Sequence, residues 1–210
     1  MDAADARFDY QNARAAGDDV VRRGLLALAA RLLAEDGPQA LTLRHLAQRA
    51  NCSTKVVYTL FGGKNGLSEG LKVEGFARLR FAVERERRRH CDPVRALLPV
   101  MLTYRSFALA HRALFGVMFG NALPEHVPTE YSRQQARLAL GAVESAVAAA
   151  RAALGAGPGN AREDTVRLWA AVHGPVTIEL EGITPFDRDG DRIARLAVKD
   201  FLDSIRLYLI

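Results

Sequence analysis

From residue 18 onward, the apolar positions of this chain recur at helical rather than strand spacing. Val21, Leu25, Leu28 and Leu32 lie three or four residues apart, which places them on one face of an α-helix. Similar spacing continues to the end of the chain, and it predicts an all-α protein. The further helices are expected at about 42–50, 53–61, 64–90, 94–120, 129–154, 161–182 and 188–208.

Helix boundary signals support this division. Asp18-Asp19 can cap the first helix and complement its dipole, and Gly37-Pro38 is expected to end it. Asp92-Pro93 is a good N-cap and first-turn pair for the helix that follows. These signals indicate separate helices joined by short turns.

Residues 42–61 predict two short helices joined by a tight turn. Thr42 is a suitable N-cap for the first, and Ser53 for the second. Asn51 falls at the corner, where the left-handed backbone conformation is needed and asparagine tolerates it better than other non-glycine residues. Val57 and Phe61, spaced i and i+4, form the inward face of the second helix.

The outward face of the second helix carries Thr54, Lys55 and Tyr58 near its start. In a helix-turn-helix, this part of the second helix meets base edges in the major groove. An ordinary surface helical hairpin has the same spacing. Spacing alone therefore favours neither interpretation.

A resemblance to a known family separates them. Residues 20–70 resemble the DNA-binding domain of the TetR family of bacterial transcriptional regulators. Asn51 is a departure, since the family usually has glycine there, but asparagine can adopt the same backbone conformation. The residues that carry the resemblance are Leu25, Ala29, Leu32, the EDGP of 35–38, Leu41, Thr42, Leu43, Arg44, Leu46, Ala47, Ser53, Val57, Tyr58, Phe61, Gly62, Lys64 and Leu67.

A second, less specific resemblance covers the C-terminal half. The stretches YRSFALAHRALFGVMFG and LWAAVHGPVTIELEG are similar to a TetR subgroup named for its Trp–His–Gly signature. The subgroup usually has proline where Arg112 stands. Pro175, inside the expected helix 161–182, is predicted to kink it.

The first resemblance implies roles in DNA binding. Lys55 can donate to guanine O6 or N7, Thr54 or Val56 can pack on a thymine methyl, and Tyr58 can hydrogen-bond a phosphate. Arg44 either contacts DNA or pairs with an acid, and Leu60 either touches a methyl group or packs inside. The expected DNA-binding residues are Thr42, Arg44, Ser53, Thr54, Lys55, Val56, Tyr58 and Lys64.

The apolar residues of 94–120 and the Trp169 helix are expected to form the core of a larger body. A body that holds a small molecule needs the same residue types around a cavity. His173 shares a helix face with Trp169 and either hydrogen-bonds a ligand or is a core histidine. The candidate ligand-binding residues are Tyr104, Phe107, Met118, Trp169 and His173.

Residues 1–17, where aspartates stand among alanines, are expected to form a mobile N-terminal arm. The resemblance implies a helix-turn-helix domain at 18–66 and a ligand-binding and dimerisation domain at 67–210. It implies a homodimer built on the last two helices, whose alanines allow close approach. Such a dimer binds a pseudo-palindromic DNA operator and is released by a small-molecule effector. A body without a ligand, serving dimerisation alone, is an open alternative.

An enzyme is a second alternative, and the sequence does not favour it. The five histidines lie in different contexts, and no paired carboxylates stand at helical spacing in an apolar stretch. Cys52 is expected to be a buried thiol, and Cys91 lies beside the cap residue Asp92 without metal-ligand spacing. We therefore expect no enzymatic activity, no cofactor and no metal.

Charge and composition agree with this assignment. The 210 residues are 49% hydrophobic and 25% charged, with a net charge of +5. Residues 20–70 hold seven Lys and Arg against three acids, an excess of four, so most of the net charge falls on the expected DNA-binding domain. No run of 18 apolar residues is present, and the acidic N-terminus does not resemble a signal peptide. A cytoplasmic protein is expected.

Overall fold

The computed structural model describes residue 10 and residues 17–120, 127–156, 160–183 and 190–207; the side chains of residues 206 and 207 are not described. Within these ranges every regular element is a helix, so the predicted all-α fold is confirmed. The expected arm at 1–17 lies outside the described residues, apart from Tyr10 and Gly17.

The chain forms two compact units that alternate along the sequence. The first comprises residues 1–75 and 112–133, and the second comprises residues 76–111 and 134–210. Two long helices, α5 (Lys64–Arg87) and α8 (Glu130–Ala153), begin in the first unit and end in the second. The functional boundary after residue 66 stays a prediction, since the compact units divide the chain elsewhere.

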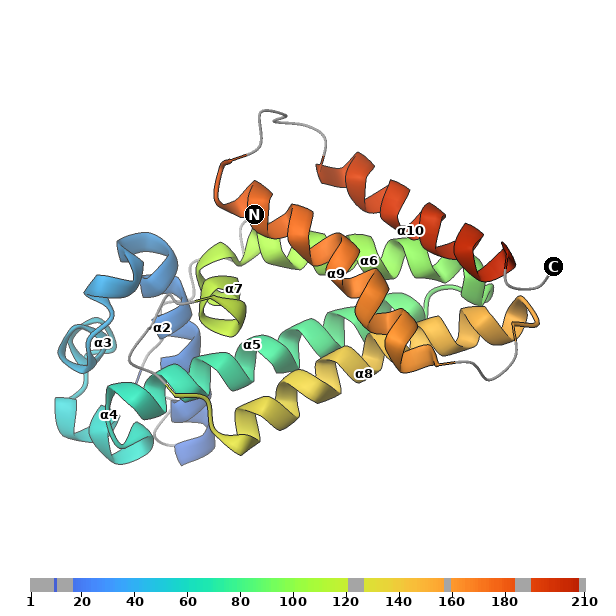
Figure 1. The fold of residues 1–210 in the computed structure, drawn as a ribbon. Helices are drawn as coiled ribbons and strands as arrows, with labels where there is room; N and C mark the ends of the chain where they lie inside the picture. Colours follow the sequence, from blue (N-terminus) through green and yellow to red (C-terminus); the bar gives the residue numbers. More distant parts are fainter. Residues whose placement is uncertain (1–9, 11–16, 121–126, 157–159, 184–189, 208–210) are drawn as a thin grey trace, which may run out of the picture. The chain divides into compact units, whose positions relative to one another are not determined.

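The first unit is built around α2 (Asp18–Ala40). Its apolar face is buried as predicted, and α3 (Leu43–Arg49), α4 (Thr54–Phe61) and α7 (Arg112–Phe119) all pack against it (Figure 1). The aspartates do not cap α2. The N-cap is Gly17, while Asp18 and Asp19 lie in the first turn, where their charge complements the helix dipole.

The predicted end of α2 at Gly37-Pro38 is only partly right. Gly37 has a φ of 78°, which interrupts the helical backbone, but one more helical turn runs on to Ala40. Proline at the start of that turn is compatible with helix, because its missing N–H has no partner there. The interruption turns the chain towards α3.

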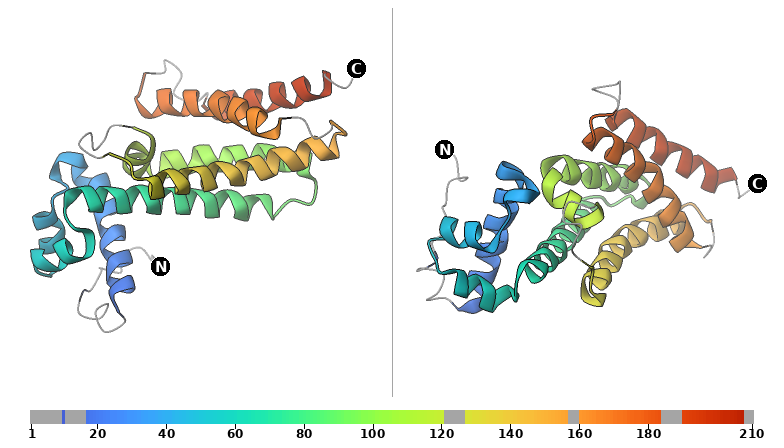
Figure 2. Two further views of the ribbon diagram at one scale, coloured as in Figure 1. Left: turned by 60° about the horizontal axis from the view of Figure 1, so that its bottom comes forward. Right: turned by 60° about the vertical axis from the view of Figure 1, so that its left-hand side comes forward.

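In the second unit, α10 (Gly190–Leu207) packs on α9 (Ala161–Leu180) and on α6 (Pro93–Ala110). Figure 2 shows α9 and α10 side by side, in orange and red, in both of its views. Asp92 caps α6 as predicted, because its Oδ1 accepts hydrogen bonds from the backbone N–H of Val94 at 2.9 Å and of Arg95 at 3.1 Å. The helix α9 continues through Pro175.

The single helix expected over 94–120 is wrong, because the chain breaks at His111. This residue has φ −128° and ψ 45°, and α7 starts at Arg112. The break divides the apolar stretch between two cores, with α6 in the second unit and α7 in the first. Apolar periodicity could not reveal this division, since both halves are rich in buried residues.

Candidate nucleic-acid interface

The helix α3 begins with the predicted cap. The Oγ1 of Thr42 accepts a hydrogen bond from the backbone N–H of His45 at 3.1 Å. Leu46, Ala47 and Ala50 are buried beneath it, whereas Leu43 is half-buried. The cap thus fixes where the helix starts and which face it buries.

A tight corner follows α3. Asn51 has a φ of 52°, in the left-handed region, and it is the one non-glycine residue with positive φ in the described part of the chain. The backbone N–H of Cys52 donates to the carbonyl of Ala47 at 3.0 Å, which holds the corner closed. Cys52, expected to be buried, is only half-buried, and this burial raises the pKa of its thiol.

Beyond the corner, the Oγ of Ser53 accepts a hydrogen bond from the backbone N–H of Val56 at 3.4 Å, which caps α4 as predicted. Val57 and Phe61 are buried, and α3 and α4 pack against each other. Together these features form a helix-turn-helix.

The outward face of α4 matches the predicted face. Thr54 and Lys55 are exposed, and the Tyr58 side chain is 61% exposed. Val56 and Leu60 are half-buried, so neither residue faces fully outward. No hydrogen bond or ion pair within the described residues engages the side chains of Lys55 or Tyr58. Both are therefore available to a partner.

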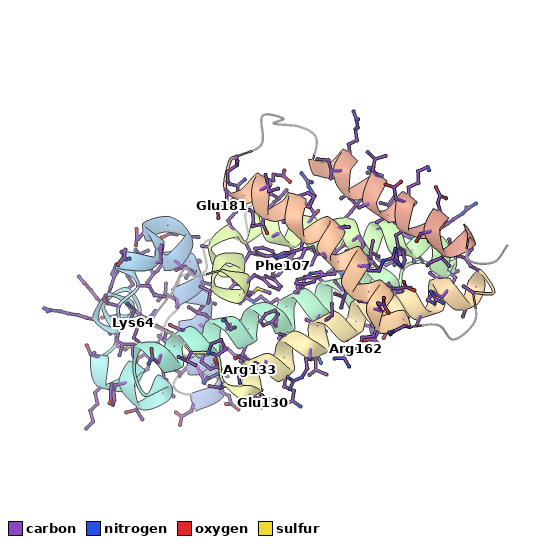
Figure 3. All side chains as sticks on the ribbon, in the orientation of Figure 1. Lys64, Phe107, Glu130, Arg133, Arg162 and Glu181 are labelled. Atoms are coloured by element: carbon purple, nitrogen blue, oxygen red, sulfur yellow. The ribbon has the colours of Figure 1, made fainter. Side chains whose placement is uncertain are left out.

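The flanking cations are also exposed. Gly62, with a φ of 69°, ends α4, and Lys64 opens α5 (Figure 3). Arg44 is exposed near the start of α3 and has no ion pair within the described ranges. It is Arg49 that pairs with acids, at 3.3 Å to Glu35 and 3.6 Å to Asp36. Among the described residues, the alternative that Arg44 pairs with an acid is therefore excluded.

Three of the five candidate ligand-binding residues come together in the second unit. Tyr104 is buried in α6, and its hydroxyl lies 2.5 Å from Nδ1 of His173 in α9. The ring of Trp169 lies 4.7 Å from the His173 ring, centroid to centroid. Burial lowers the pKa of His173 and raises the pKa of Tyr104. A neutral imidazole that accepts the phenolic hydrogen at Nδ1 fits both shifts.

Of the other two candidates, Phe107 lies on α6 with Tyr104, whereas Met118 belongs to α7. The ring of Phe107, inside the second unit (Figure 3), lies 4.8 Å from that of His111. Met118 belongs to the first unit, where it packs on Gly75 so closely that a Cβ there would lie 2.5 Å from the methionine sulfur. The helical break at His111 explains why these two residues, close in sequence, serve different cores.

Two family models match the chain. The model of the tetR family of bacterial regulatory proteins matches residues 25–71, which contain the helix-turn-helix. The model of the tetracyclin repressor-like C-terminal domain matches residues 97–201, half of the chain. This chain belongs to the TetR family. TetR-family proteins are DNA-binding transcription regulators, and the helix-turn-helix described above is their DNA-binding element.

Solved structures agree with this TetR assignment. A protein of unknown function from Rhodococcus sp. RHA1 is 30% identical, with a TM-score of 0.75, over 87% of this chain and 94% of that chain. Two TetR-family regulators, PfmR from Thermus thermophilus and one from Bordetella parapertussis, are each 18% identical with TM-scores of 0.59. The match with PfmR covers 85% of this chain and 97% of PfmR, and the match with the Bordetella protein covers 87% of this chain and 94% of that protein. Both share the fold of this chain. Curated protein sequences gave no match. The Trp–His–Gly subgroup stays a prediction.

Sequence reasoning missed a polar junction of the TetR C-terminal region. Arg105 of α6 donates two hydrogen bonds to Glu179 of α9, from Nε at 3.0 Å and from Nη2 at 2.6 Å. Gly190, the first residue of α10, lies against this pair, and a Cβ there would be 2.2 Å from a Glu179 oxygen. The partners are 74 residues apart in sequence, so no local signal could have revealed them.

A groove of about 570 Å³ is also lined by residues of α9 and α10. Arg167, Ala171, Leu196 and Asp200 are among its lining residues. Leu196 is 44% exposed, which is a large exposure for leucine on a packed helix. This TetR protein therefore has an uncovered, partly apolar surface on its last two helices in the isolated chain.

The described part of this TetR chain contains no cluster of three metal-binding side chains. None of its described helices combines the length and apolarity that crossing a bilayer requires.

Proposed function

We propose that this chain is a sequence-specific transcriptional repressor that binds a pseudo-palindromic operator as a homodimer and releases it when a small molecule binds the C-terminal helices. The observation that carries the proposal is the outward face of α4, where Thr54, Lys55 and Tyr58 are exposed on a short helix with a fixed start. Major-groove recognition uses the N-terminal part of such a helix.

Within this proposal each side chain has a role. Lys55 donates to guanine O6 or N7, Thr54 or Val56 contacts a thymine methyl, and Tyr58 hydrogen-bonds a phosphate. Lys64 and the first backbone N–H groups of α5 hold a second phosphate, since a helix N-terminus attracts anions. The capping residues Thr42 and Ser53, together with Arg44, complete the contact surface.

The groove on α9 and α10 supports the dimer. A twofold axis brings the same surface of two chains together, so Arg167 of one chain can face Asp200 of the other. The alanines in this surface allow the helices to approach closely. Two reading helices would then meet half-sites roughly 34–36 Å apart on the DNA.

The cluster of Tyr104, Trp169 and His173 is the candidate effector site. A ligand that hydrogen-bonds His173 and packs on Trp169 would have to displace or extend the present Tyr104 hydrogen bond. By linkage, an effector that weakens operator binding by some factor is itself bound more weakly by the same factor when the operator is present.

A second candidate function is a DNA-binding regulator whose C-terminal helices serve dimerisation alone. One observation favours it: Tyr104 is 1% exposed, and its hydroxyl is already bonded within the protein. Release of the operator by the low-molecular-weight fraction of a bacterial extract would separate the two candidates. Release supports the ligand-controlled repressor, and persistent binding supports the ligandless regulator.

The test of the proposed function is selection of fragmented genomic DNA on the purified full chain at about 150 mM salt, where non-specific binding is weak. We expect recovery of discrete sites with twofold sequence symmetry. Recovery of DNA without a shared motif would contradict sequence-specific binding.

A further inference from the structure

Arg22 of α2 lies against the end of the reading helix α4. Its guanidinium carbon is 5.2 Å from the centroid of the Phe61 ring, within the range of a cation–π contact. Phe61 is the last residue of α4 and is 7% exposed. Arg22 itself is half-buried, and no ion pair within the described ranges involves it. Its contact is therefore with an aromatic ring rather than with a carboxylate.

Gly70 of α5 leaves room for this contact. A Cβ at this position would lie 3.5 Å from Nη2 of Arg22, 3.6 Å from the Phe61 ring and 2.9 Å from Leu26. Three helices, α2, α4 and α5, therefore meet around the guanidinium. The arrangement is compact enough that a shift of Arg22 changes the packing of Phe61.

The charge of Arg22 also suits this place. The C-terminal end of a helix carries a partial negative charge, which cations stabilise. The last turn of α4 contains no basic residue of its own. Arg22 supplies from α2 the cation that α4 lacks.

We infer that Arg22 is a positioning residue for DNA reading: its cation–π contact with Phe61 fixes the C-terminal end of α4 and so sets the angle at which Lys55 and Tyr58 meet the DNA. This inference rests on the proposed function. It differs from a phosphate contact, which would add affinity for all sequences equally. It differs also from a purely structural role, which would change unfolding and leave the folded protein's DNA selectivity intact.

The test compares the full-length wild type with Arg22→Met, Arg22→Lys and Arg23→Met. Arg23 is the adjacent, exposed arginine, so its substitution removes the same charge and leaves the cation–π contact of Arg22 in place. The dissociation constants for the selected operator and for a scrambled duplex of equal length are measured at several salt concentrations. Thermal unfolding of each variant identifies loss of folding.

For Arg22→Met we expect about a tenfold loss of operator affinity, corresponding to about 1.4 kcal/mol, with the scrambled duplex changed less than about twofold. The slope of log K against log salt should stay unchanged. Arg22→Lys keeps the charge and should recover part of the loss. Arg23→Met should keep the ratio of specific to non-specific affinity.

Three results would overturn the inference. Equal losses for Arg22→Met on both duplexes, with a salt slope smaller by about two, one for each chain of the dimer, would make Arg22 a phosphate contact. Unchanged operator affinity in a folded Arg22→Met protein would remove any positioning role. Hydrogen exchange without DNA gives the third readout: we expect faster exchange at the end of α4 in Arg22→Met, and an unchanged rate there contradicts the inference.

Failure of the proposed function looks different. In that case the wild type itself selects no site, whatever residue occupies position 22. The hydrogen-exchange comparison still decides whether Arg22 holds the end of α4.

Discussion

Tyr58 and Tyr104 place the same side chain in opposite environments. Tyr58 of α4 is 61% exposed and its hydroxyl has no partner within the described residues, whereas Tyr104 of α6 is 1% exposed and bonded to His173. In the first unit, polar groups on α4 are left free to meet a partner. In the second unit, polar groups of α6 and α9 bond to each other and join the two helices. In the proposed function, DNA would therefore be read by polar groups that have no partner in the free chain, whereas an effector would have to compete with bonds already formed.

The largest expected effect comes from removing the free groups of α4. The double substitution Lys55→Ala with Tyr58→Ala should weaken operator binding at least about a hundredfold, since it removes a base contact and a phosphate contact in each half-site. Dimerisation and thermal unfolding should stay unchanged. Gel-shift titration and size-exclusion chromatography provide the measurements.

The matched control is Tyr131→Ala with Arg133→Ala, an exposed tyrosine and cation of the first unit outside the helix-turn-helix. We expect this control to keep operator affinity within about threefold, because surface substitutions away from a site have small effects. Equal losses in the two double variants would show that α4 is not the reading helix.

The next effect concerns the internal bonds of the second unit. Gly190→Ala places a Cβ 2.2 Å from a Glu179 oxygen and 3.0 Å from the Arg105 Nε, so the ion pair must move. We expect a loss of about 1–3 kcal/mol in the free energy of unfolding, as for other overpacking substitutions.

Gly141→Ala is the control for this substitution. Gly141 lies inside α8, and a Cβ there meets nothing within 4 Å. Because alanine has a higher helix propensity than glycine, we expect the free energy of unfolding to rise by about 0.5–1 kcal/mol. Chemical denaturation measures both variants, and a Gly190→Ala protein as stable as Gly141→Ala would contradict the tight junction.

The corner between α3 and α4 gives a smaller effect. With a φ of 52° at Asn51, Asn51→Gly should be close to neutral, whereas Asn51→Val should cost about 1–2 kcal/mol because a β-branched residue is strained there. Thermal unfolding of the two variants tests this prediction. Equal melting temperatures would mean that the corner does not need the left-handed conformation.

The smallest effect is a pH dependence from His173. Burial lowers its pKa, so between the folded value and the ordinary value of 6.5 the unfolded chain binds more protons than the folded chain. Stability should therefore fall as the pH drops below 6.5. Desolvation, and to a smaller extent the charge of Arg78, also lower the pKa of His111. Because His111 is exposed, it should contribute less than His173 to the pH dependence of stability.

The His173→Gln variant should lose part of this pH dependence, which denaturation at pH 5 to 8 would measure. A variant with the same pH profile as the wild type would mean that His173 is not buried in neutral form.

The helix-turn-helix could be predicted from sequence because its determinants are local. Thr42 and Ser53 cap helices through backbone groups no more than three residues away, and Asn51 adopts the unusual backbone itself. Each of these residues determines the backbone within about one helical turn of itself. Residue type and spacing were therefore sufficient.

The second unit depends on contacts between distant residues. Tyr104 and His173 are 69 residues apart, and their bond was not predictable, although both residues were candidates. The break at His111 assigns Met118 and Phe107 to different units, which apolar spacing does not encode. The Arg22 contact with Phe61, in the first unit, likewise joins two helices through a ring that sequence analysis assigned only to packing.

The most direct test of α4 as the reading helix is selection from randomised DNA by the wild type and by Lys55→Ala, with the motifs compared base by base. We predict that Lys55→Ala keeps the motif but loses its preference at one base position in each half-site, where the lysine contacts guanine. An identical motif, with only weaker binding overall, would contradict the assignment of Lys55 to a base and of α4 to sequence recognition.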